Sequence, residues 1–149
     1  ALHLYLETWV SESRVPVDEA LKQSFKKIGW FPGYRTHYSQ RFAINFESCP
    51  ESLQLLEEVV LARNRFEHPP TITSIRTNYA HADLKKLPHP FFVDEREADL
   101  FADAEEGERA WFIPPTLHVT ETQLIAAVAV VEGFAKWFDA EIENRVYAQ

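Results

Sequence analysis

The clearest helix signal in this chain is the stretch SCPESLQLLEEVVLARNRFEHPP, residues 48–70. Ser48, followed three residues later by Glu51, has the pattern of a helix-capping box, and a proline is tolerated in the first helical turn. The helix should end at the two closing prolines, because the residue before a proline is pushed out of the helical region. His68 would then lie in the last turn or just beyond. The apolar positions recur at helical spacing, and they are Leu53, Leu56, Val59, Val60 and Phe66.

Three more segments have helical periodicity. Residues 1 to about 11 and residues 16–28 predict two helices, the second closed by Gly29. A turn rich in aromatic residues is expected at residues 30–33, and residues 40–47 are ambiguous. The final helix should start at Thr120 with a second capping box. Its predicted apolar stripe is Leu124, Ala127, Val128, Val131, Phe134, Phe138 and Ile142.

Residues 71–118 show little helical period and separate the third predicted helix from the last. Two short apolar runs, residues 91–93 and 111–113, could pair as a small hairpin around a stretch with eight acids, residues 94–108. A solvated acidic loop is the competing interpretation. Amphipathic helices can bury their stripes only by packing together. We therefore expect an all-α, four-helix up-down bundle forming one domain over residues 1–149, with an insertion at about 71–118.

The composition narrows the classes of protein to consider. The net charge of −8 argues against a general nucleic-acid coat protein, although a nuclease with a small basic cleft remains compatible. No apolar run approaches the roughly 20 residues that a spanning helix needs, so no membrane partner is expected. A single cysteine, Cys49, fits a reducing compartment and predicts a cytoplasmic protein.

Common catalytic and metal-binding motifs are absent from the sequence, so we expect no cofactor and no metal. Cys49 is better interpreted as a small packed residue than as a nucleophile. What remains is Arg63-Asn64-x-x-x-His68 at the end of the third predicted helix. Asn64 and His68 are four residues apart and could share a helix face, so that the amide orients the imidazole. Arg63 offers a planar fork of donors for phosphate oxygens, and a histidine is suited to proton transfer.

These residues resemble the signature of the HEPN family of helical-bundle proteins, which is an arginine, four to six residues and then a histidine, often with Asn after the arginine. The resemblance implies a metal-independent endoribonuclease in which two protomers join their motifs, and a role as a toxin or anti-phage effector. It assigns catalysis to Arg63 and His68, orientation to Asn64 and a weaker phosphate contact to Arg65. The chain departs from one toxin subgroup, which often has a tyrosine two residues past the histidine, where Pro70 stands here.

The expected partners are an RNA substrate, a second copy of the chain, and an antitoxin or other protein. Two alternatives stay open: a non-catalytic HEPN-like protein-interaction module, and an unrelated helical bundle that binds a partner through its acidic insertion. Arg63 could also pair with Glu67 while His68 caps the helix. A second Arg-x4-His match, from Arg76 to His81, lies in the irregular segment and is taken as incidental.

Overall fold

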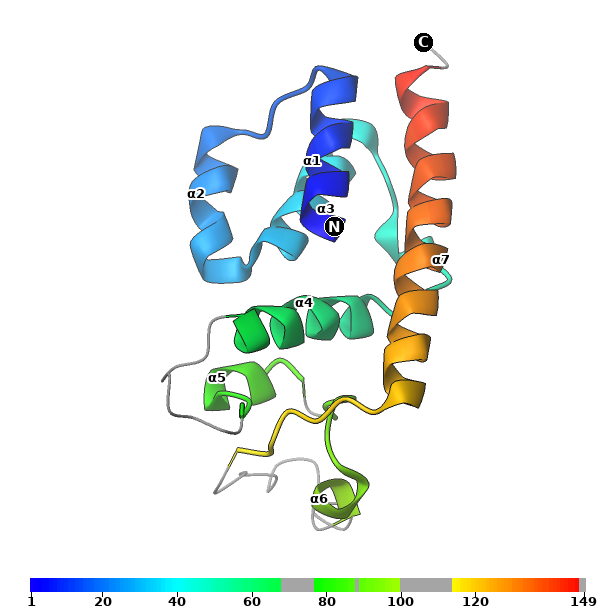
Figure 1. Ribbon diagram of the computed structural model, residues 1–149. Helices are drawn as coiled ribbons and strands as arrows, with labels where there is room; N and C mark the ends of the chain where they lie inside the picture. Colours follow the sequence, from blue (N-terminus) through cyan, green and yellow to red (C-terminus); the bar gives the residue numbers. More distant parts are fainter. Residues whose placement is uncertain (68–76, 88, 100–113, 148–149) are drawn as a thin grey trace. The chain divides into compact units, whose positions relative to one another are not determined.

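The computed structural model describes residues 1–67, 77–87, 89–99 and 114–147 (Figure 1). Within these ranges the regular structure is helical, apart from one isolated β-bridge between Asn78 and Thr116. The expected all-α class is confirmed. None of the helices in the described ranges combines the length and apolarity required to cross a membrane. The chain divides into two compact units, residues 1–52 with 131–149, and residues 53–130.

The first unit has a core rich in aromatic side chains. It contains α1 (Leu2–Ser13), α2 (Glu19–Ile28), α3 (Trp30–Phe42), the short 3-10 helix η1 (Phe46–Ser48) and the second part of α7 (Glu121–Val146). The hydroxyl of Tyr5 and the indole N–H of Trp9 both donate to Asp139 Oδ1, which ties α1 to α7. The Tyr38 and Phe138 rings pack with centroids 4.8 Å apart. Burial of such rings stabilises this unit, because aromatic side chains remove a large apolar area from water.

The aromatic turn expected at residues 30–33 is wrong, because these residues form the first turn of α3. Gly29 alone separates α2 from α3, and its φ of 92° is a backbone conformation that glycine adopts without a steric penalty. Pro32 lies in the first turn, where a missing N–H costs no helical hydrogen bond. Gly33 lets the Phe25 ring approach the helix, since a Cβ built there would lie 2.2 Å from that ring.

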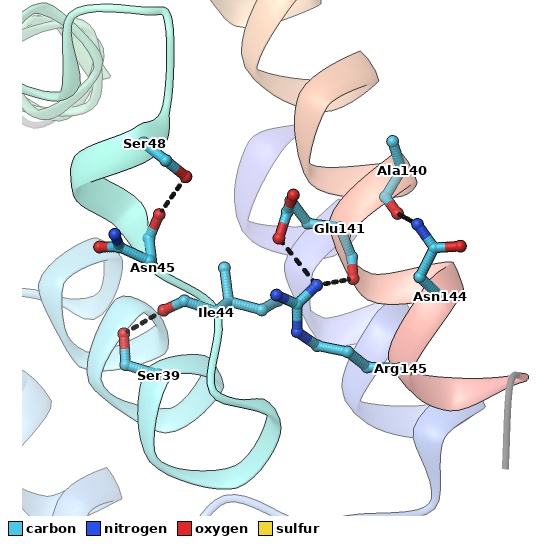
Figure 2. A network of polar contacts seen from close by, with 8 residues as sticks. All are labelled: Ser39, Ile44, Asn45, Ser48, Ala140, Glu141, Asn144 and Arg145. Carbon is cyan, nitrogen blue, oxygen red and sulfur yellow. Dashed lines mark hydrogen bonds and ion pairs between the residues drawn. The ribbon is translucent and has the colours of Figure 1, made fainter.

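The capping box predicted at Ser48 is also wrong. Figure 2 shows the Ser48 hydroxyl donating to the Asn45 carbonyl, at 2.7 Å, within η1. In the turn before it, the Ser39 hydroxyl donates to the carbonyl of Ile44 at 2.9 Å. The Ser48 side chain therefore closes a 3-10 turn, and α4 begins later, at Leu53.

The second unit contains α4 (Leu53–Glu67), α5 (His81–Leu84), α6 (Glu95–Asp99) and the first part of α7. Two of the predicted stripes are only partly correct. Phe66 is 52% exposed, and on α7 Leu124 and Val128 are also exposed, whereas Ala127, Phe134, Phe138 and Ile142 are buried as expected. The buried cluster of this unit combines α4, α5, α7 and the segments between them. Its members are Ala62, Tyr79, Leu84, Leu87, Phe92, Val93, Leu117 and Ala127.

The capping box at the start of α7 is confirmed. Thr120 Oγ1 accepts from the backbone N–H of Gln123 at 3.2 Å, and Gln123 Oε1 accepts from the Thr120 backbone N–H at 2.9 Å. These reciprocal bonds satisfy two groups that a helix start otherwise leaves unpaired. The Gln123 amide also donates to the carbonyl of Phe91 at 2.6 Å, which attaches the residue 91–93 segment to the helix start.

The expected hairpin between residues 91–93 and residues 111–113 stays a prediction. Residues 91–93 form no strand, and the Phe92 carbonyl accepts instead from the His118 backbone N–H at 2.9 Å. The predicted partner run, residues 111–113, lies outside the described residues, as does the acidic stretch after Asp99. In α6, Glu97 is bound rather than free, because its carboxylate accepts from both the backbone N–H and the hydroxyl of Thr116.

Candidate functional site at the end of α4

The last turn of α4 carries the first part of the predicted motif. The helix is continuous to Glu67, so Arg63 and Asn64 have helical geometry. The Arg63 side chain is 64% exposed, while Asn64 is half-buried. Arg63 Nη1 donates to Asn64 Oδ1 at 3.4 Å, a long contact that leaves most of the guanidinium available. The arginine is therefore displayed at the surface and does not contribute to the apolar face.

Arg63 has an acidic neighbour on the next turn. Its Nη2 lies 2.7 Å from Glu67 Oε2, the i to i+4 pairing considered as an alternative from the sequence. Both side chains are well exposed, and surface pairs of this type contribute at most about 1 kcal/mol. A phosphate oxygen reaching this surface can compete with the Glu67 carboxylate for the same donors.

Arg65 is held much more firmly than Arg63. Its Nε and Nη2 donate to Asp83 Oδ2 at 3.2 and 2.7 Å, and the side chains of the two residues are only 33% and 16% exposed. The same oxygen of Asp83 accepts from the Ala80 backbone N–H at 3.0 Å. The structure therefore places Arg65 in a link between α4 and α5, which engages two of its donor nitrogens.

His68 lies outside the described residues, so the structure locates Arg63, Asn64 and Arg65 but not the predicted proton carrier. Of the second Arg-x4-His match, Arg76 also lies outside the described residues. His81 is described and begins α5 as an exposed residue. The assignments of His68 and Asn64 therefore remain predictions from the sequence.

The structure shows a buried acid that was not predicted from the sequence, Glu58, five residues before Arg63 on α4. Glu58 is 1% exposed, and its Oε1 accepts from the Tyr79 hydroxyl at 2.6 Å and from the backbone N–H groups of Phe91 and Phe92 at 2.6 and 2.9 Å. Burial, together with the negative charge of Glu58, raises the pKa of Tyr79 well above its usual value, so this phenol stays protonated and donates. No signal in the sequence marked this burial, because Glu58 shares its helix face with Ala62, and the burial of Ala62 is also seen only in the structure.

Two residues of the first unit do not favour catalysis there. Burial raises the pKa of the Cys49 thiol, which disfavours the reactive thiolate. Burial and the neighbouring Arg41 lower the pKa of His37, so that its ring tends to stay neutral. An open depression of about 410 Å³ in this unit contains none of the predicted site residues. Its lining is Pro32, Arg35, Thr36, Ser39, Gln40 and Phe46.

Comparisons with protein-family models, with curated proteins and with solved structures give no match for this chain.

Proposed function

We propose that this chain is a HEPN-like, metal-independent endoribonuclease that acts as a homodimer in defence or stress response. The observation that carries the proposal is the placement of Arg63 on an intact final turn of α4, with its guanidinium exposed. A catalytic arginine must reach a phosphate that arrives from solvent, and an arginine on the apolar face could not. The sequence adds His68 directly after the described end of the helix.

The proposed reaction is transfer within the RNA strand. The 2′-hydroxyl attacks the adjacent phosphorus, its proton passes to His68, and the bond from phosphorus to the 5′-oxygen breaks. The leaving oxygen then takes a proton from a protonated histidine, which the second protomer's copy of the motif would supply. Arg63 stabilises the charge that develops on the phosphorane oxygens, and electrostatic stabilisation of this type is usually a large contribution to catalysis. The products are a 2′,3′-cyclic phosphate and a 5′-hydroxyl.

The direct test is cleavage of a panel of single-stranded RNAs by the purified chain in excess EDTA. DNA lacks the attacking hydroxyl and should survive. His68→Ala should reduce the rate on the order of 10²–10⁴-fold by removing the proton carrier. Arg63→Ala should reduce it on the order of 10²–10³-fold by removing charge stabilisation.

The second Arg-x4-His match supplies internal controls. Arg76→Ala and His81→Ala should leave the cleavage rate nearly unchanged. Cleavage that persists in the His68→Ala protein would show that the activity belongs to other residues or to a contaminant. A wild-type protein that leaves every RNA intact would refute the nuclease.

A non-catalytic interaction module is the second candidate, and the ion pairs of the motif favour it. Arg63 of the motif and Arg65 beside it each have a carboxylate partner within the chain, Arg63 with Glu67 and Arg65 with Asp83. In this function the motif would stabilise the end of α4, and a protein partner would bind elsewhere. The two candidates separate on activity, since only the nuclease requires Arg63 and His68 for RNA cleavage.

A further inference from the structure

A pair of lysines, Lys85 and Lys86, directly follows α5 in the second unit. We propose that these two lysines bind the sugar–phosphate backbone of single-stranded RNA and so extend the substrate-binding surface beyond the motif. This inference rests on the proposed nuclease function. It is carried by the packing of α5 against α4 and by the distribution of charge around the motif.

The position of the lysines is fixed by their neighbours in sequence. Leu84 and Leu87 are 8% and 3% exposed and belong to the same buried cluster as Ala62 of α4. Lys85 and Lys86 lie between these two anchors and are both exposed. Two leucines held in the core leave the intervening side chains directed to solvent, where a flexible polyanion can reach them.

The lysines are also near the motif. Arg65, two residues after Arg63, binds Asp83 through two donors, and Asp83 is two residues before Lys85. Figure 1 shows α5 beside the C-terminal half of α4, in agreement with this ion pair. Arg63 and Arg65 are two positions apart on α4 and point to different sides of the helix, so an RNA strand that contacts both Arg63 and the lysines would cross the last turn of α4.

The sequence segment that begins with the motif has a net charge opposite in sign to that of the whole chain. Residues 63–89 hold five of the chain's 15 Lys and Arg but only two of its 23 Asp and Glu. Those two acids are Glu67 and Asp83, and each is paired with an arginine of the motif. Neither lysine makes an ion pair with a residue in the described ranges. Among the described residues of this segment, Lys85 and Lys86 are therefore the cations without an acidic partner, and exposed cations of this type are the electrostatic requirement for binding RNA.

The test measures RNA binding in a His68→Ala background, so that the RNA stays intact, by fluorescence anisotropy of a labelled single-stranded RNA at several salt concentrations. Lys85→Glu with Lys86→Glu should weaken binding about 10- to 100-fold at low salt. It should also reduce the slope of log affinity against log salt by about 1.4, since each contact to single-stranded RNA contributes about 0.7. In the active protein the same change should raise KM and leave kcat nearly unaltered.

The matched control is Lys26→Glu with Lys27→Glu. These adjacent lysines lie in the last turn of α2, are exposed, and give the same change in net charge. Equal loss of affinity in both double variants would overturn the proposal, because it would reflect net charge alone. Unchanged binding in the Lys85/Lys86 variant of a protein that still cleaves RNA would overturn the lysine surface and leave the nuclease standing. A wild-type protein that binds RNA through the lysines but never cleaves it would overturn the nuclease and leave the lysine surface standing.

Discussion

The charged residues near the end of α4 differ mainly in how deeply they are buried. Glu58 is fully buried and the Arg65–Asp83 pair is partly buried, and the carboxylates of Glu58 and Asp83 each accept several hydrogen bonds, so they fix the positions of neighbouring segments. The Arg63–Glu67 pair is exposed and makes few contacts. Removing a buried partner leaves a desolvated group unpaired, whereas removing an exposed partner leaves a group that water can solvate. Substitutions at Glu58, Arg65 or Asp83 should therefore lower the stability of the fold. Substitutions in the exposed Arg63–Glu67 pair should instead change the proposed RNA binding and leave the fold intact.

Glu67→Gln should strengthen RNA binding if Arg63 contacts phosphate. The carboxylate competes for the guanidinium, and an exposed pair of this type contributes about 0.2–1 kcal/mol, so affinity should rise about 1.5- to 5-fold. The measurement is anisotropy with labelled RNA in the His68→Ala background. Glu141→Gln is the matched control, because it breaks the i to i+4 pair of Glu141 with Arg145, also 2.7 Å long, and makes the same change in charge. A gain of equal size in the control would remove the role assigned to Glu67.

Tyr79→Phe should destabilise the second unit by about 1.5–3 kcal/mol. The substitution deletes a buried hydrogen bond to the Glu58 carboxylate, and bonds to charged acceptors contribute about that much. Amide hydrogen exchange at Phe91 and Phe92, whose N–H groups bind the same oxygen, should become faster. Tyr147→Phe, at a 65% exposed position, should leave both quantities unchanged. Full retention of exchange protection in Tyr79→Phe would show that the network is not cooperative.

At the scale of whole elements, the short junctions between helices depend on the backbone conformation of single residues. Gly29 connects α2 to α3 with φ 92° and ψ 153°. Ala43 ends α3 in the left-handed region, with φ 52° and ψ 33°, although it has a Cβ. The first junction uses the residue that fits its conformation, and the second carries a small strain that glycine would relieve.

These two junctions predict opposite effects of exchanging glycine and alanine. Gly29→Ala should lower the free energy of unfolding by about 1–3 kcal/mol, because its conformation is nearly restricted to glycine. Ala43→Gly should be neutral or stabilising by up to about 1 kcal/mol, since glycine is favoured at a left-handed helix end. Urea unfolding followed by circular dichroism measures both. Destabilisation of similar size by both changes would show that packing, and not φ, controls these positions.

For the whole molecule, the proposed activity requires more catalytic groups than one copy of the motif provides. One arginine and one histidine are a small catalytic set, and a two-fold symmetric dimer can bring two copies of each residue together. The second unit also exposes apolar side chains that a partner copy could bury, among them Phe66 on α4 and Leu124, Ile125 and Val128 on α7. Leu124, Ile125 and Val128 are near neighbours on α7, and contiguous exposed apolar side chains often mark interaction surfaces.

We therefore predict that the chain is a dimer at micromolar concentration. Light scattering should give a mass of twice 17.3 kDa. Phe66→Asp should shift the population toward the monomer, because burial of a charge in an apolar contact is costly. Lys26→Asp, on an already polar surface, is the control and should not. A wild-type mass of 17.3 kDa would contradict the dimer and leave the reaction without its second histidine.

Sequence alone determined the features that depend on near neighbours in the chain. Helical periodicity and the Thr120–Gln123 capping box located α1, α4 and α7, and the all-α class followed from them. The motif residues at 63, 64 and 68 were likewise readable as a pattern, since their spacing is local. Their roles as a nuclease site stay predictions.

Only the tertiary structure showed which side of each helix is covered. Phe66 and Leu124 match a stripe but are exposed, and the acid Glu58 is buried, because burial depends on what packs against a face. The ion pair of Arg65 with Asp83 joins residues 18 positions apart, and the Phe25 ring of α2 lies against Gly33 of α3. Periodicity gives the angle between side chains on one helix, whereas burial and long-range pairing depend on how the segments pack, which local spacing does not encode.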